Sequence, residues 1–189
     1  GHHAMPGTGM GYCVFNNVAL AARAALDAGV PRVLVVDFDA HDGNGTRACL
    51  RGRPDCLHVS LHQAGLFPET TGGRELPSGP DGSGAACLPM APGAGDAEYA
   101  AAFREVVEPI ADAFRPGLVL VSAGFDGHRD DPMSDLDLTD AGYAAMTASI
   151  LAIARRFGPG RVGFVLEGGY DPASLGRAAA ACLDVLRMD

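Results

Sequence analysis

The feature that most constrains the fold is an alternation of short apolar runs with longer helical patterns. Four runs are rich in β-branched residues and have the length of buried strands: RVLVVDF (32–38), LHVSLH (57–62), LVLVSAG (118–124) and VGFVLEG (162–168). Ala-rich segments with helix start or stop signals alternate with them, at residues 16–28, 96–114, 139–157 and 172–188. This alternation predicts an α/β domain with a parallel sheet.

The length and the loops set the domain organisation. A chain of 189 residues is long enough for one domain with one core, and we assign residues 1–189 to it. Residues 63–95 are rich in Gly and Pro and exceed the usual length of a connection, so we expect a functional loop region there.

Charge and cysteine content narrow the class of protein. The net charge of −9 argues against binding to a nucleic-acid backbone, whereas it permits a cationic substrate. The five cysteines form no C-x-x-C pair and are odd in number, which favours free thiols in a reducing, cytoplasmic setting. No apolar run reaches the length of a transmembrane helix, so we expect no membrane partner.

Polar residues gather where the predicted strands end. They include the carboxylates and histidine of VVDFDAHD (35–42), the SLH of 60–62, Asp126, and the EGGY of 167–170. Ligands of open parallel sheets bind outside the carboxyl ends of the strands. Four strand ends of this kind therefore predict one functional site.

The first of these strand ends offers metal ligands. If the strand continues to residue 41, Asp37, Asp39 and His41 share one face, since side chains alternate along a strand. Asp126 could add a third ligand, and three protein ligands with an open position are typical of catalytic zinc. A carboxylate–histidine hydrogen bond without any metal explains the same motif, and the motif alone leaves both interpretations open.

Two further features are ambiguous on their own. The opening GHHA is explained equally by the remnant of a purification tag and by two histidines that carry out acid–base chemistry. Tyr170 follows two glycines, and it could donate its hydroxyl to a developing oxyanion or be a simple turn residue.

Taken together, the motifs resemble the histone deacetylase family, which includes the acetylpolyamine amidohydrolases. The resemblance runs in order through GHHA (1–4), GYC (11–13), FNN (15–17), DFDAHDGNGT (37–46), SLH (60–62), LFPET (66–70), SAGFDGHRDDPM (122–133) and LEGGYD (166–171). It implies an arginase-like fold, a three-layer parallel sheet with helices on both faces. It also implies hydrolysis of an acyl-lysine or acylpolyamine type of amide.

The resemblance assigns roles to particular positions. Asp39, His41 and Asp126 match zinc ligands, although iron(II) or cobalt(II) would also suit such donors. His3 matches the general base and acid, held by Asn44, and His2 pairs with Asp37. Tyr170 matches the tyrosine that polarises the amide carbonyl. A neutral Asn at position 44, in place of Asp, should leave His3 with a lower pKa.

Further positions match the substrate tunnel and a structural ion. Tyr12 and Phe67 match aromatic walls of a narrow tunnel, beside Gly11 and with Met133 at its rim. A structural potassium site is implied at a second set of residues: Asp37, Asp39, His41, Ser60 and Leu61. The expected partner is a small-molecule or peptide acylated amine.

Two departures from the family keep alternatives open. Asp42 stands where the family usually has a second histidine, one place too early to serve an arginase-like second metal, so it should face away from the site. The family also has an N-terminal part that supplies further strands, and we expect this chain to be a fragment without it, the alternative being an unusually short homologue. We therefore expect a sheet edge able to pair with that part or with a second copy. A two-metal ureohydrolase and a catalytically silent binding module remain the alternative functions.

Overall fold

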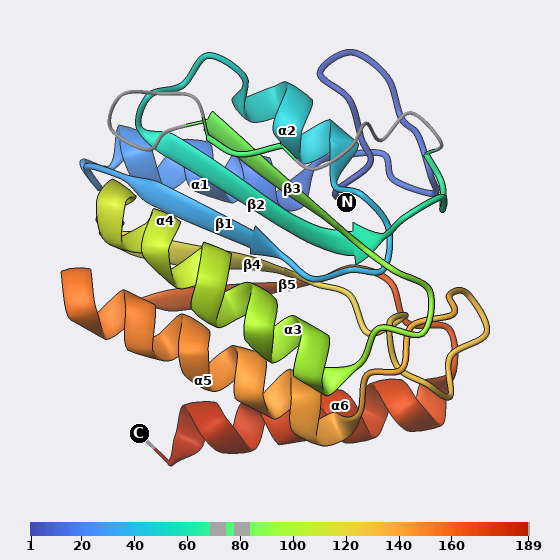
Figure 1. Ribbon diagram of the computed structural model, residues 1–189. Helices are drawn as coiled ribbons and strands as arrows, with labels where there is room; N and C mark the ends of the chain where they lie inside the picture. The colour runs from blue at the N-terminus through green and yellow to red at the C-terminus, as the bar shows by residue number, and fades with distance from the viewer. Residues whose placement is uncertain (69–74, 78–83, 189) are drawn as a thin grey trace.

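A five-stranded, fully parallel sheet forms the centre of the molecule, in a computed structural model that describes residues 1–68, 75–77 and 84–188 (Figure 1). The strand order is β3-β2-β1-β4-β5. The strands are β1 (Val33–Asp37), β2 (Cys56–Gln63), β3 (Gly84–Met90), β4 (Leu118–Ala123) and β5 (Val162–Leu166). The predicted parallel α/β fold is confirmed.

Helices cover both faces of the sheet, which makes three layers (Figure 1). One face carries α1 (Asn17–Asp27) and α2 (Asn44–Leu50). The other carries α3 (Asp96–Ala102), the π-helical η1 (Phe103–Val107), α4 (Glu108–Phe114), α5 (Asp140–Phe157) and α6 (Pro172–Arg187). In the described part of the chain, no helix has both the length and the apolarity needed to span a bilayer.

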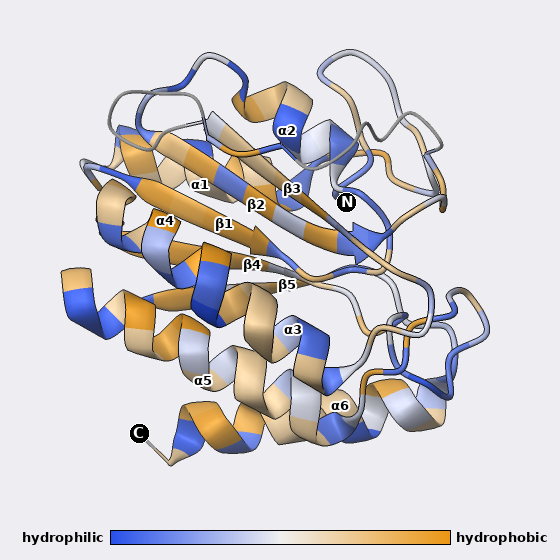
Figure 2. Cartoon of the chain, viewed as in Figure 1, coloured by the Kyte–Doolittle hydropathy of each residue, from blue (hydrophilic) through white to orange (hydrophobic). Residues whose placement is uncertain are grey.

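The core explains why the strands read as continuous apolar runs. Side chains of β1 alternate between the two faces: Leu34 and Val36 join the larger cluster beneath α3–α6, while Val33 and Val35 join the smaller one beneath α1. Burial on both faces requires apolar residues at successive positions. Hydropathy changes at the carboxyl end of β2, where His62 and Gln63 follow the apolar run (Figure 2).

Three elements differ from the prediction. The strand β3 lies inside residues 63–95, which we had assigned to loops; its Ala85, Ala86 and Pro89 have low strand propensity, and Pro is tolerated because β3 is an edge strand. The short helix α2 was not predicted, since it has only seven residues and begins after a glycine.

The third difference lies in the segment predicted as one helix over residues 96–114. It contains the π-helical turn η1, whose last bond runs from Glu108 N–H to the Phe103 carbonyl. Pro109 follows directly and has no N–H to continue the regular ladder. The bounds of the other helices agree with the prediction within about two residues.

The strand order places a crevice at one point of the sheet. From β1 the chain proceeds outward through β2 to β3, then crosses back to β4 on the other side of β1 and continues to β5. The carboxyl ends of β1 and β4 therefore flank the topological switch point, where ligands of such sheets bind. Residues that follow these two strands are the first candidates for a site.

Candidate active site

A buried triad of Asp39, His41 and Asp126 lies at this switch point. The Nδ1 atom of His41 is 3.0 Å from Oδ1 of Asp39 and 2.9 Å from Oδ2 of Asp126. One ligand atom from each residue lies within 4.8 Å of the others, and no second cluster of this kind occurs among residues 1–68, 75–77 and 84–188. The residues predicted as metal ligands are thus brought together.

The triad is not formed in the way that strand alternation predicts. The strand β1 ends at Asp37, so Asp39 and His41 lie beyond it. Carboxylates organise the turn instead: Asp37 accepts the N–H of Asp39 at 3.2 Å, and Asp39 accepts the N–H of His41 at 2.9 Å. Asp126 accepts the N–H of Ala40 at 2.9 Å. Local side-chain to backbone bonds of this kind replace the strand ladder.

Glycines allow the surrounding backbone to approach the triad. A side chain at Gly124 would collide with Asp39, and one at Gly168 would collide with Asp126. The N–H of Gly168 donates to Oδ2 of Asp39 at 2.8 Å. These contacts fix the Asp39 carboxylate from two strand ends, which gives the triad a defined geometry.

The charges of the triad suit a divalent cation. Burial and the neighbouring charge of Asp39 raise the pKa of Asp126 to about 6. Burial lowers the pKa of His41, but hydrogen bonds to Asp126 and Asp39 outweigh it and raise the value to about 10. Two buried carboxylates therefore demand positive charge between them, and a metal bound to neutral His41 would supply it. A set of one imidazole and two carboxylates fits zinc, iron(II) or cobalt(II).

The tandem histidines lie beside the triad and each has the predicted partner. The Nδ1 atom of His2 is 3.0 Å from Oδ2 of Asp37, and Nδ1 of His3 is 2.7 Å from Oδ1 of Asn44. Both rings are buried, and the His3 ring centroid lies 6.0 Å from that of His41. These contacts make the tag interpretation of GHHA unnecessary.

The pKa values of the two histidines are shifted in opposite directions. Burial opposes protonation of His2, but Asp39 and Asp37 outweigh it and raise the pKa to about 10. Burial and the charge of His2 lower the pKa of His3 to about 4, although the bond to Asn44 acts in the opposite direction. At neutral pH one imidazole is therefore charged, and its neighbour is neutral and able to accept a proton.

A cavity of about 540 Å³ joins these groups to the surface. It is lined by both histidines, by Asp39 and His41, and by the residues predicted for the tunnel: Gly11, Tyr12, Phe67, Met133 and Tyr170. The Phe67 ring stands edge-on to the His3 ring at 5.0 Å. Glu69 and Thr70 of the LFPET motif lie outside the described residues.

Tyr12, one of the two predicted aromatic walls, lines the cavity together with Phe67. Its side chain is 92% exposed, so it stands at the mouth of the cavity. The backbone at Gly11 and Tyr12 has positive φ, and a side chain at Gly11 would collide with the His3 ring. The turn thus brings the chain against His3 while directing the Tyr12 side chain outward.

Tyr170 lines the same cavity and is 46% exposed. Its backbone N–H donates to Oδ2 of Asp131 at 2.6 Å. Burial, with the charges of Asp126 and Asp39, raises the pKa of its phenol to about 12, so the hydroxyl keeps its proton and can donate a hydrogen bond.

Two polar residues face away from the triad. Asp42 is buried and pairs with Arg47 through both carboxylate oxygens, at 2.9 and 2.7 Å, so it is not available to a second metal. His128 has its Nε2 atom 3.2 Å from Oδ1 of Asp140. Neither belongs to the cluster that could hold a metal.

Of the five residues proposed for potassium, Asp39 and His41 line the cavity, whereas Asp37, Ser60 and Leu61 are not among its lining residues. Asp37 is the register partner of Ser60 in β2, and both side chains, like that of Leu61, are buried. The Ser60 hydroxyl contacts Nδ1 of His62 at 2.9 Å.

Three residues with structural importance to the site were not assigned to it from the sequence. Glu167 accepts the N–H of His2 at 3.0 Å and the Ser122 hydroxyl at 3.2 Å. Asp131 accepts the backbone N–H of Tyr170, and Asn16 donates to the carbonyls of His2 and Ala4. The position of Glu167 at a strand end was the one available signal.

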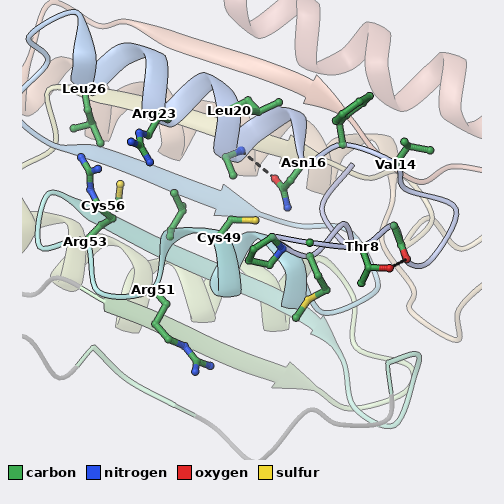
Figure 3. A pocket seen from close by; sticks show the side chains of 17 residues that line it. Thr8, Val14, Asn16, Leu20, Arg23, Leu26, Cys49, Arg51, Arg53 and Cys56 are labelled. Carbon is green, nitrogen blue, oxygen red and sulfur yellow. Dashed lines mark hydrogen bonds between the residues drawn. The ribbon is translucent and has the colours of Figure 1, made fainter.

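A second cavity of about 660 Å³ lies against α1 and α2 (Figure 3). Leu20, Arg23 and Leu26 border it from α1, and Cys49 from α2. No residue of the triad lines it, so the candidate site belongs to the smaller cavity.

Comparison with known proteins agrees with the geometry. A sequence profile of the histone deacetylase domain matches residues 1–186. The chain is 40% identical to histone deacetylase 14, chloroplastic, of Arabidopsis thaliana over 95% of its own length and 43% of that protein. It is also 40% identical to the histone deacetylase-like amidohydrolase of Pseudomonas aeruginosa, over 98% of its length and 50% of that protein.

Solved structures give the same result. The HD domain of HDA15 superimposes with a TM-score of 0.87 at 39% identity, covering 98% of this chain and 53% of that one. The histone deacetylase Clr3 matches with a TM-score of 0.82 at 38% identity, covering 91% of this chain and 30% of that one. The chain therefore spans about half or less of the relatives it matches, and it belongs to the histone deacetylase family.

Proposed function

We propose that this chain carries the catalytic centre of a metal-dependent amidohydrolase that removes acyl groups from a lysine-like or polyamine-like amine. The observation that carries the proposal is the facing arrangement of a metal-binding triad and a neutral histidine: His3 and His41 line one cavity with ring centroids 6.0 Å apart. The names of the relatives, deacetylases and amidohydrolases, support the same reaction class.

The chemistry of each side chain in the site indicates its role in the reaction. Asp39, His41 and Asp126 would hold a divalent metal, zinc by preference, which would supply Lewis-acid chemistry for the amide carbonyl and for water. His3 accepts the proton of the attacking water at Nε2, because Nδ1 is engaged by Asn44, and returns it to the leaving amine. Tyr170 donates its hydroxyl to the developing oxyanion.

The surrounding charges support this assignment. His2, held by Asp37, keeps a positive charge beside His3. This charge disfavours protonation of neutral His3, so His3 stays ready to accept the proton of the attacking water. Phe67 and Met133 both line the cavity, and such apolar walls suit a slim acyl-amine chain. The net charge of −9 suits a cationic substrate.

The alternative functions are weaker. A two-metal ureohydrolase requires a further free carboxylate, and Asp42 is occupied by Arg47. A catalytically silent module would retain the fold without turnover. Assays with an acetyl-lysine peptide and with acetylated polyamines, each with and without added zinc, separate the proposal from both alternatives: metal-dependent amide hydrolysis supports the proposal, and its absence on every substrate contradicts it.

Further properties are proposed on the same basis. A structural potassium ion would bind at Asp37, Asp39, His41, Ser60 and Leu61, partly through backbone carbonyls. The chain acts in the cytoplasm. The edge strand β5, where the Leu166 side chain is 60% exposed, would pair with another strand, from an N-terminal segment such as the resemblance implies or from a second copy. Light scattering of the purified chain, with and without such a segment, tests the last point.

A further inference from the structure

The residue that departs from the family, Asp42, forms a closed ion pair directly behind the metal centre. It follows the metal ligand His41 in sequence, and its carboxylate receives both terminal nitrogens of Arg47 at 2.9 and 2.7 Å. The Asp42 side chain is fully buried. Bidentate geometry holds the two side chains in one relative orientation.

The pair spans the start of α2, a helix that needs support. This helix has seven residues, and its N-cap, Gly43, provides no side-chain bond. Asp42 precedes the cap, and Arg47 is the fourth helical residue. Many helices place an apolar pair at these two positions, and its contact fixes the angle at which the chain enters the helix. Here the ion pair occupies the same positions and imposes the same restraint.

The restrained turn carries two groups of the site. His41 lies just before it, and Asn44, the first residue of α2, holds Nδ1 of His3 at 2.7 Å. Asn44 N–H donates to the carbonyl of Asp42 at 2.8 Å. The turn has little freedom, because a side chain at Gly43 would collide with Asp37. A change in its angle would therefore move Asn44 relative to His41.

Arg47 also anchors the turn to the sheet. Its guanidinium lies 2.6 Å from the sulfur of Cys87 in β3. Cys87 is the register partner of Ser60 in β2. The restraint thus runs from the sheet, through Arg47 and Asp42, to the turn between the metal ligand and the residue that orients the base.

We propose that Asp42 and Arg47 are positioning residues that fix the placement of Asn44, and through it His3, relative to the metal ligand His41. Stability alone is a poor explanation for the pair, because buried ion pairs can be replaced by apolar residues without loss of stability. The kinetic part of the inference rests on the proposed function; the geometric part does not.

The kinetic test compares zinc-loaded variants. Asp42→Asn and Arg47→Gln each remove the ion pair, and the double variant leaves no buried charge unpaired, which guards against misfolding. The control is Arg53→Gln, which breaks the Arg53–Asp55 pair of similar geometry, at 2.9 and 2.8 Å, away from the site. We expect kcat to fall about ten- to hundredfold in the Asp42 and Arg47 variants, with KM within about twofold and zinc retained, and no change in the control. An unchanged kcat in the folded double variant overturns the inference.

A double-mutant cycle separates positioning from a general structural role. If Asp42 acts through Asn44, then Asp42→Asn should have almost no further effect on kcat in an Asn44→Ala background, while its effect should multiply with that of Tyr170→Phe. Multiplicative effects with both partners overturn the inference.

Crystallography of Asp42→Asn provides a readout that is independent of turnover. We expect the 2.7 Å contact between His3 and Asn44 to lengthen or break in this variant and to remain in Arg53→Gln. If the wild-type protein hydrolyses no acylated amine, the proposed function fails while this arm still decides the inference. An intact contact in Asp42→Asn rejects it.

Discussion

The carboxylate of Asp131 holds the backbone of Tyr170: its Oδ2 atom accepts the Tyr170 N–H at 2.6 Å and the Asp171 N–H at 3.0 Å. The other oxygen accepts the N–H of Met133 at 3.0 Å. One buried side chain therefore fixes both a rim residue of the cavity and the residue proposed to stabilise the oxyanion. This connection crosses from the segment after β4 to the segment after β5.

Removal of the Tyr170 hydroxyl should affect chemistry without affecting metal binding. In Tyr170→Phe we expect turnover to fall about a hundredfold or more, because one preorganised oxyanion donor is lost. Zinc content should remain at the wild-type level, as the hydroxyl is not among the ligands. Steady-state kinetics with metal analysis checks both expectations, and full turnover would make Tyr170 a turn residue only.

Replacement of Asp131 should impair Tyr170 indirectly, through the backbone of that residue. Asp131→Ala leaves three backbone N–H groups without their acceptor, so we expect the free energy of unfolding to fall by about 1–3 kcal/mol and kcat to fall as Tyr170 loses its fixed position. The exposed Asp112→Ala serves as a control, since its only described partner is Arg156 at the surface. Chemical denaturation and steady-state kinetics compare the two variants. Equal unfolding free energies and equal kcat values in Asp131→Ala and Asp112→Ala would contradict the role of Asp131.

Metal binding should release a proton. In the metal-free protein His41, with a pKa of about 10, is protonated at neutral pH, and this proton must leave before Nδ1 can bind a metal. We expect about one proton released per zinc, and an affinity that rises about tenfold per pH unit between pH 7 and 9. Below a pH of about 6, Asp126 also gains a proton, so the zinc affinity should fall more steeply as the pH decreases. Calorimetry in buffers of different ionisation enthalpy measures the release; no proton release would contradict the assignment of His41.

A charge at position 44 should shift the pH at which His3 works. His3 is neutral above its pKa of about 4, and only the neutral form accepts a proton. In Asn44→Asp a carboxylate replaces the amide against Nδ1, which should raise the pKa of His3 by about one unit or more. Activity would then be lost at a higher pH as the pH falls. The acid limb of kcat/KM at saturating zinc, with NMR titration of His3, tests this; an unmoved limb would show that His3 does not govern it.

The sequence predicted four of the five strands, the main helices and the triad because each has a local signature. Strands such as β1 are continuous apolar runs, and strand order places their polar ends together. The reason given for the triad was nevertheless wrong: Asp39 and His41 lie beyond the strand and are oriented by carboxylate–backbone bonds. Spacing alone could not distinguish these two geometries.

The elements that were missed owe their structure to tertiary contacts. The strand β3 forms by pairing with β2 despite its alanines and Pro89. The helix α2 has no side-chain cap, and an ion pair between Asp42 and Arg47 supports it. The exposure of Tyr12 depends on the positive φ at residues 11 and 12, which no local pattern announced.

Metal stoichiometry tests the central claim most directly, namely that Asp39, His41 and Asp126 hold one catalytic divalent ion. The measurement is zinc content by mass spectrometry after chelation and reconstitution, with amide hydrolysis recorded at each step, in the wild type, Asp126→Ala and the control Asp112→Ala. We predict one equivalent of zinc and restored hydrolysis in the wild type and the control, and neither in Asp126→Ala. Stoichiometric zinc in Asp126→Ala, hydrolysis by the chelated protein, or a requirement for two equivalents would contradict the account.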